Sequence, residues 1–318
     1  MGVWQVPSDL LAGSRFTVSP MVEAVAALKA LINPRTPWQR AWREPHVDAF
    51  RRMLAARPVV RALLPASFYP RWMADFLTIA PALPDPTFAS ELATVAALPD
   101  ERIRADLRAT RPEPLAAELL ADGLTAEVVA LLRWIWAHTV EPEWAERERR
   151  LRADIVARTA ALSTRGWAGV LADLNRDMRW LGEGRLQIND YPDPALSLHR
   201  AEQLIFLPAH CPRGWVVWDL PTRFGMVYPA RGILVDPTSP APDGLARLIG
   251  ANRADILARL ESPLSTSHLV ALTGLSLGTV SDHLRVLLDA GAVDKRRSGR
   301  EVLYWRTPLG AALVATGG

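Results

Sequence analysis

Apolar residues in the first 180 positions recur with the spacing of amphipathic helices. Between residues 21 and 32, Val22, Val25 and Leu28 follow one another at intervals of three, after a serine and a proline of the kind that begin a helix. The same period continues over residues 48–64, 88–98, 124–139 and 144–163, with proline-rich breaks between these segments. The pattern therefore predicts a helical region over residues 16–182.

The pattern changes at residue 185. Short segments rich in β-branched and aromatic residues now alternate with breaks of Pro, Gly, Asn and Asp, which is typical of strands. The predicted strands cover residues 185–189, 203–208, 215–220 and 224–228. The second and third are expected to form a hairpin across AHCPRG, and the four together a small β-sheet over residues 185–236.

Three prolines in the stretch DPTSPAPDG, residues 236–244, mark a linker between two domains. We expect residues 1–242 to form one large domain and residues 243–318 a compact second one. In the second, residues 245–260 predict an amphipathic helix with Leu248, Ile256, Leu257 and Leu260 on its apolar side.

Two further helices with a glycine between them follow. Ser265 begins a group of capping residues before a helix at 268–273, which Gly274 ends, and Ser276 caps a second helix at 277–290. Leu277, Val280 and Leu284 form part of the apolar stripe of this second helix. Two short helices joined by such a turn are typical of a helix-turn-helix.

The opposite face of that second helix carries small and polar residues, which let a backbone approach DNA and reach phosphates or base edges. A hairpin is predicted next, with strands at 292–297 and 301–306 and a turn at Ser298 and Gly299. Its tip carries Lys295, Arg296, Arg297 and Arg300. A cationic hairpin after a helix-turn-helix is a wing that contacts the DNA backbone or minor groove.

This order of elements predicts a winged helix-turn-helix that binds double-stranded DNA. The fold class is therefore α+β and predominantly α-helical, with a large helical N-terminal domain, a small sheet and a C-terminal winged helix-turn-helix. The expected DNA-binding residues are Ser276, Gly278, Thr279, Ser281, Asp282, His283, Arg285, Lys295, Arg296, Arg297 and Arg300.

Residues 248–310 resemble the winged helix-turn-helix of ArsR-type bacterial transcriptional regulators. The most specific pieces are VSDHLRVLLDAG, the R-x-G-R turn at 297–300 and VLYWRTPLG at 302–310. The resemblance implies a dimeric regulator, most often a repressor that leaves operator DNA when an effector binds. It also implies that Ser281 and His283 lie near DNA and that Leu284 belongs to the core.

Upstream segments resemble a large domain of unknown function that precedes such winged helices in high-GC bacteria. They are RFTVSPMVEAVAALKAL, LIFLPAHCPRGWVVWD and MVYPARG. The resemblance touches most of the chain, but only its C-terminal part implies an activity.

The chain departs from the family at both of its metal sites. The first helix of the helix-turn-helix lacks the Cys-x-Cys pair, and residues 309–315 hold no His, Asp or Glu. We therefore expect a non-metal effector. Asp282 is a second departure, because phosphates repel a carboxylate unless it accepts from a cytosine amino group or pairs with Arg285.

Charge supports DNA binding through its location. The chain has 37 Lys and Arg against 34 Asp and Glu, a net charge of only +3. Residues 243–318 hold 9 basic residues against 7 acidic ones, and four of the nine lie within residues 295–300. One cysteine, Cys211, excludes an intrachain disulfide and suits a reducing compartment. With neither signal peptide nor spanning segment in the sequence, we expect a cytoplasmic protein with no membrane partner.

The sequence contains few signatures of catalysis or metal binding. There is no GxSxG, no P-loop and no paired histidine spacing, and residues 182–184 are half of a dinucleotide motif better interpreted as a turn. His210 and Cys211 are expected to be plain turn residues, with a redox role for Cys211 as a minor alternative that needs a lowered thiol pKa. We expect no enzyme activity, no cofactor and no bound metal.

Eleven of the twelve tryptophans precede residue 243. The favoured interpretation is a core built from large side chains, and the alternative is an aromatic cavity for a flat or apolar effector. The tryptophans that would line such a cavity are Trp38, Trp42, Trp72, Trp134, Trp215 and Trp218.

Together these patterns predict a homodimeric, sequence-specific transcriptional regulator. It is expected to be an ArsR-like repressor released by a non-metal small molecule bound in a sensor and dimerisation domain, residues 1–242. One alternative is an enzyme with a catalytic N-terminal domain and a regulatory winged helix. Another is a winged helix that contacts only proteins.

Overall fold

The computed structural model describes residues 2–69, 72–110, 113–172, 174, 177–230, 243–260, 263–298 and 301–316. The chain divides into two compact units. The first comprises Met1–Arg147 and Leu171–Pro229, and the second Glu148–Val170 and Ala230–Gly318. The last predicted sheet positions, 231–236, and the predicted linker up to residue 242 lie outside the described residues.

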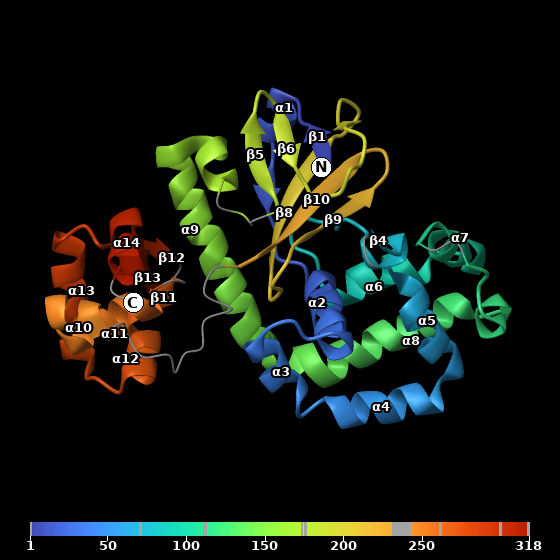
Figure 1. Ribbon diagram of the computed structural model, residues 1–318, viewed down its shortest axis with the longest axis horizontal. Helices are drawn as coiled ribbons and strands as arrows, with labels where there is room; N and C mark the ends of the chain where they lie inside the picture. The colour runs from blue at the N-terminus through green and yellow to red at the C-terminus, as the bar shows by residue number, and fades with distance from the viewer. Residues whose placement is uncertain are drawn as a thin grey trace. The chain divides into compact units, whose positions relative to one another are not determined.

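Helices make up most of the first unit (Figure 1). They are α1 (Ser8–Ala12), α2 (Pro20–Ile32), α3 (Pro37–Arg43), α4 (Val47–Ala56), α5 (Pro58–Ser67), α6 (Phe88–Ala96), α7 (Asp100–Thr110), α8 (Leu124–Ile135) and α9 (Trp144–Leu171), whose residues 148–170 belong to the second unit. Short helical turns are η1 (Asp75–Leu77), η2 (Ala117–Leu120), the π-helical η3 (Trp136–Val140) and η4 (Glu141–Glu143).

The helices differ from the predicted segments where proline and glycine interrupt them. Residues 48–64 form two helices, because Pro58 lacks the amide hydrogen needed to continue α4 and instead begins α5. The segment predicted at 144–163 extends to Leu171, with an interruption at Gly166, where φ is 62°. Helix α7 lies within the predicted helical region but was not singled out as a segment, because Ile103 and Leu107 alone supply its fully buried stripe.

Two four-stranded sheets complete the first unit, which corrects the expectation of one sheet within residues 185–236. Their orders are β5-β6-β1-β7 and β2-β8-β10-β9, beside a small pair β3-β4. The strands are β1 (Val3–Gln5), β2 (Arg15–Phe16), β3 (Phe68–Tyr69), β4 (Trp72–Met73), β5 (Arg179–Gly182), β6 (Arg185–Gln187), β7 (Leu196–Ser197), β8 (Gln203–Ala209), β9 (Trp215–Asp219) and β10 (Arg223–Pro229). Each large sheet thus recruits a strand from the first 16 residues.

The predicted hairpin between the strands at 203–208 and 215–220 is wrong. Strand β10 lies between them, parallel to β8 and antiparallel to β9. Six consecutive residues of β8, Leu204 to Ala209, are buried. Such a continuous apolar run is typical of a strand covered on both faces and paired in parallel, whereas a half-exposed hairpin strand alternates.

Helix α2 lies at the centre of the first unit. Val25, Leu28 and Leu31 are fully buried in the helical core, while Val22 and Ala26 pack against residues of the β2-β8-β10-β9 sheet. A helix that is apolar or small on nearly every side can be enclosed in this way. Its last turn carries Lys29, which therefore has a fixed place between helices and sheet.

The second unit contains the predicted winged helix-turn-helix. Its elements are α10 (Asp243–Ile249), α11 (Ala251–Arg259), β11 (Leu264–Ser265), α12 (Thr266–Thr273), α13 (Leu277–Asp289), β12 (Val293–Ser298), β13 (Glu301–Arg306) and α14 (Pro308–Thr316). The strands form one sheet in the order β11-β13-β12. The chain is thus a mixed, mainly helical α+β protein, as the sequence predicted.

The helix predicted at 245–260 is two helices. Gly250, with φ of 88°, separates α10 from α11 in a conformation that only glycine adopts readily. This break turns Leu248 outward, so that it is 71% exposed rather than part of the apolar stripe. Ile256, Leu257 and Leu260 are fully buried, as expected. No helix in the described part of the chain is long and apolar enough to cross a membrane.

Candidate nucleic-acid interface and ligand cavity

The turn between α12 and α13 is fixed by caps. Ser265 caps α12, Gly274 ends it with φ of 69°, and the Ser276 hydroxyl accepts a hydrogen bond from the Thr279 amide at 3.2 Å. Each cap satisfies backbone groups that the helix itself leaves unpaired. These residues have the roles that the sequence predicted for them.

Helix α13 presents two different faces. Val280, Leu284 and Leu287 are at most 3% exposed and pack into the core of the second unit. Leu277 was expected in the same stripe but is 59% exposed, because it begins the helix beyond the reach of that core. The outward face carries exposed predicted DNA-binding residues: Ser276, Gly278, Ser281, Asp282 and Arg285.

Four of the predicted DNA-binding residues of α13 have more specific surroundings. Arg285 donates to Asp282 at 2.6 Å, and both side chains are about two-thirds exposed. Thr279 is partly buried beside the cap. His283 is also partly buried, and its Nε2 is enclosed without a hydrogen-bond partner among the described residues. His283 therefore does not point outward with the other predicted DNA-binding side chains.

Strands β12 and β13 form the wing. Lys295, Arg296 and Arg297 are consecutive exposed residues of β12. Ser298, predicted as a turn residue, is instead the last residue of β12 and pairs with Glu301. Successive side chains of a strand point to opposite faces, which places Arg296 opposite Lys295 and Arg297. Arg300, the fourth predicted wing cation, lies outside the described residues.

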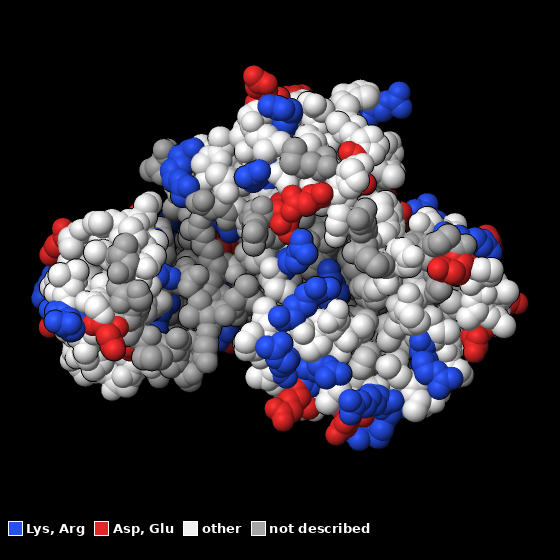
Figure 2. Space-filling model, viewed as in Figure 1, with Lys and Arg blue, Asp and Glu red and all other residues white. Residues whose placement is uncertain are grey.

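A second basic surface lies on the first unit, and sequence reasoning did not single it out. Figure 2 shows blue side chains gathered on the surface of α3 and α4. Residues 35–61 hold seven arginines and two acidic residues. Arg40, Arg52 and Arg61 in this segment are exposed. A count over residues 1–242 conceals this cluster, because acidic residues elsewhere balance it.

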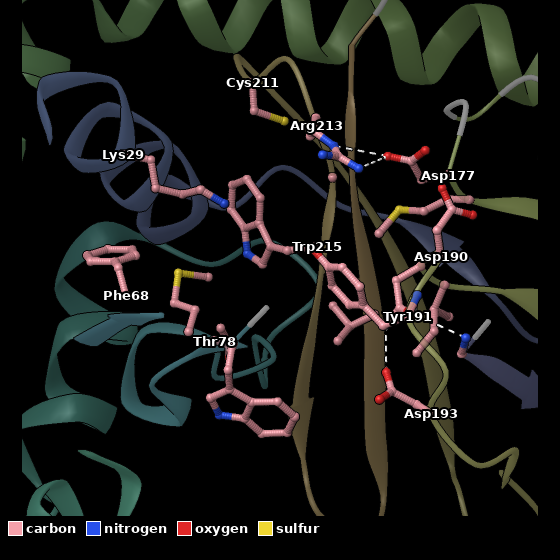
Figure 3. A pocket seen from close by; sticks show the side chains of 18 of the residues that line it. Lys29, Phe68, Thr78, Asp177, Asp190, Tyr191, Asp193, Cys211, Arg213 and Trp215 are labelled. Carbon is pink, nitrogen blue, oxygen red and sulfur yellow. Dashed lines mark hydrogen bonds and ion pairs between the residues drawn. The ribbon is translucent and has the colours of Figure 1, made fainter. Parts of the chain in front are cut away.

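The first unit contains a cavity of about 850 Å³. Its lining comes from β1, the end of α2, the β3-β4 pair, β9 and the segment around residues 188–196, and Figure 3 shows part of it. A cavity of this volume lies within the range of small-molecule sites. Four tryptophans line it: Trp4, Trp72, Trp215 and Trp218.

Three of the six tryptophans predicted to line a cavity are therefore in this lining, namely Trp72, Trp215 and Trp218. The other three pack elsewhere. Trp38 stacks on Trp42 and on His210, with ring centroids 6.4 Å and 6.2 Å apart. Trp134 stacks on His138, with centroids 4.5 Å apart. Trp4, which sequence reasoning missed, reaches the cavity because its strand pairs with β6 and β7.

Lys29 is a partly buried cation in the lining of this cavity. Its Nζ lies 4.2 Å from the centroid of the Trp215 ring, a favourable cation–π arrangement. Burial lowers the pKa of Lys29 to about 8. Figure 3 shows Lys29 and Cys211 in one part of the cavity and Asp190 and Asp193 in another.

His210 is not a plain turn residue. It is 4% exposed, and its backbone amide and Nδ1 contact the two oxygens of buried Glu23 at 2.7 Å and 2.8 Å. Arg147 contacts the same carboxylate at 3.0 Å. Burial alone would raise the pKa of Glu23, but His210 and Arg147 outweigh it and lower the pKa to about 2. This network joins residues 187 positions apart.

Cys211 is also buried, at 3% exposed. Burial raises its thiol pKa, the opposite of what a redox sensor needs. Among the described residues, no group of three or more His, Cys, Asp and Glu side chains could hold a metal ion.

A family model described as "Helix-turn-helix domain" matches residues 251–296, from α11 into β12. No curated protein matches the chain. The match covers the capped turn, the whole of α13 and the first wing cations. It supports a DNA-binding transcriptional regulator.

Proposed function

We propose that this chain is a homodimeric, sequence-specific transcriptional regulator, an ArsR-like repressor that a non-metal small molecule releases from its operator. The observation that supports it most is the geometry of the second unit. An exposed polar face on α13 is followed directly by three exposed cations on β12. This is the combination of a base-reading helix and a phosphate-contacting wing.

In this proposal α13 enters the major groove, where Ser281 and Arg285 reach base edges. Lys295, Arg296 and Arg297 neutralise phosphates from the wing, and the amides at the start of α13 near Ser276 meet a further phosphate. Arg300, the fourth cation of the predicted wing, is also assigned a phosphate contact in this proposal.

The first unit is the sensor in this proposal. It binds an effector without transforming it, and its cavity of about 850 Å³ supports this role. The proposal needs no metal, because the family's thiolate and carboxylate ligands are missing from both metal positions.

Footprinting and titration on the DNA upstream of the gene test the proposal. The triple variant Lys295→Ala, Arg296→Ala, Arg297→Ala should weaken binding to every duplex and reduce the slope of log affinity against log salt by about 0.9 for each lost phosphate contact. A matched variant, Arg40→Ala, Arg52→Ala, Arg61→Ala, removes the same charge from exposed positions on the first unit. For this variant, the slope of log affinity against log salt should equal that of the unchanged protein.

Two results would contradict the proposal. If the protein protected no DNA at low or moderate salt, the winged helix would serve protein contacts instead. If both triple variants lost affinity equally, net charge rather than the wing would carry binding.

A further inference from the structure

We propose that the cavity of the first unit binds a flat, largely apolar small molecule that carries one anionic group, and that Lys29 pairs with this anion beside Trp215. This deepens the proposed function, since it names the chemical class of the effector. It depends on the proposed function in one respect: the cavity is taken to be the site at which the effector binds.

Lys29 has no anionic partner among the residues that the structure describes. Its ammonium group makes a cation–π contact with Trp215 and no ion pair or hydrogen bond within the described part of the chain. Of the other cations in the lining, Arg213 is paired with Asp177, and Arg35 is exposed. An enclosed charge without a counter-ion is costly, so a ligand that supplies the anion gains a strong, charge-assisted contact.

The groups that face Lys29 leave this part of the cavity positive. Arg35 and Arg213 both disfavour the charged form of Lys29, although Asp177 pairs with Arg213. Cys211 favours the charged form, but burial raises the pKa of this thiol and so keeps it neutral, which leaves Arg35 as the uncompensated charge. A carboxylate or phosphate monoester bound here would relieve this uncompensated potential.

Aromatic and apolar side chains supply the surface for the rest of the ligand. Trp72, Trp215 and Trp218 line the cavity together with Phe68 and Met73. The lining also holds four of the large apolar side chains that are unusually exposed for their type, namely Ile32, Tyr69, Trp72 and Leu196. Apolar surface left open at a concave site is typical of a place that a ligand covers.

The opposite part of the cavity would repel the anion and so orient the ligand. Asp190 accepts from Gln187 at 2.7 Å, and Asp193 accepts from Asn189 at 3.2 Å, so both carboxylates are held in place. In Figure 3 they lie on the other side of Trp215 from Lys29. The anionic group therefore belongs at the Lys29 end.

Burial lowers the pKa of Lys29 to about 8, and a bound anion favours the charged amine. Binding should therefore take up protons near pH 8. Affinity for an anionic ligand should fall as the pH rises above about 8, because the free protein then holds Lys29 neutral.

Calorimetry on the full-length chain tests the inference with three probes of one shape: 2-naphthoate, 2-naphthyl phosphate and neutral 2-naphthamide. At pH 7 we expect at least one of the two anions to bind at least tenfold more tightly than the amide. In Lys29→Met this preference should disappear while the amide still binds, and Lys29→Arg should restore it. Arg133→Met, which removes an exposed cation of the same unit outside the cavity lining, should keep the preference.

Comparison of the two anions distinguishes a carboxylate site from a phosphate site. Equal binding of the anions and the amide, or an anion preference that survives in Lys29→Met, would overturn the inference. DNA titration of the same protein samples tests the proposed function separately. If the protein binds operator DNA but shows no preference for the anionic probes, only this inference is wrong. If it prefers the anionic probes but binds no operator DNA, only the proposed function as a regulator is wrong.

Discussion

Arg285 and Asp282 form an ion pair on the exposed face of α13, with Nη2 and Oδ1 2.6 Å apart. They are three positions apart and therefore lie on one side of the helix. Each side chain is about two-thirds exposed, so the pair contributes little to stability. The pair matters for DNA binding, because Asp282 engages the side chain of Arg285 on the face of α13 that is predicted to contact DNA.

Asp282→Asn should strengthen DNA binding in general. The substitution releases Arg285 and removes a charge that phosphates repel, so affinity for unrelated duplexes should rise several-fold and the salt slope should steepen by about one. Gel-shift titrations at two salt concentrations measure both quantities. A selective loss of operator affinity would instead show that Asp282 accepts from a cytosine amino group.

Ser281→Ala and Arg285→Ala should relax sequence preference. Both residues are exposed on α13, where base contacts discriminate by about 1–3 kcal/mol each. Operator affinity should fall towards that for random DNA, which should change much less. The control is Arg133→Ala on the first unit, for which the ratio of the two affinities should be unchanged.

Lys29 should react with amine reagents at unusually low pH. Because burial lowers its pKa to about 8, its labelling rate should rise with a midpoint near that pH, whereas an ordinary lysine is still protonated there. The chain has only two lysines, so peptide mapping after trinitrobenzenesulfonate treatment separates Lys29 from Lys295. A labelling midpoint near 10 would show that Lys29 is solvated rather than enclosed.

Glu91 should make the first unit less stable as the pH rises from about 4.5 to 7. It is 9% exposed, and burial raises its pKa to about 7 despite hydrogen bonds from Ser19 and Met21. The folded chain therefore holds a proton that the unfolded chain releases in this range. The accompanying loss of unfolding free energy is about 3 kcal/mol.

Glu91→Gln keeps an acceptor but does not ionise, so its unfolding free energy should change less between pH 5 and pH 8. The difference from the unchanged protein over this pH range should be about 2.5 kcal/mol. Urea unfolding followed by tryptophan fluorescence measures it, since ten of the twelve tryptophans belong to the first unit. Identical pH profiles would place the Glu91 pKa in its ordinary range.

The winged helix-turn-helix was predictable from sequence because its determinants are local. Ser276 caps α13 by accepting from the amide three residues ahead, and Gly274 ends α12 in a left-handed conformation. The stripe of Val280, Leu284 and Leu287 has the helical period. Even here, Leu248 and Leu277 were misplaced, since periodicity does not show where a neighbouring core ends.

The first unit was predictable only as a set of helices and strands. Its sheets depend on pairing between the first 16 residues and strands after residue 179, and nothing in the alternation of either segment specifies its partner. The predicted hairpin failed for this reason. The apolar run of β8 is compatible with several strand partners. Tertiary packing determines that its partner is β10, in parallel.

The sequence by itself determined the helix-turn-helix, its caps and the position of the wing cations, because each depends on contacts between residues close together in the chain. Only the tertiary structure decided which tryptophans surround a cavity. The fold also placed Lys29 among them with no counter-ion in the part of the chain that the structure describes. It also joined Glu23 to His210 across 187 positions. Burial and desolvation are properties of the whole packed unit, and local patterns of polarity do not encode them.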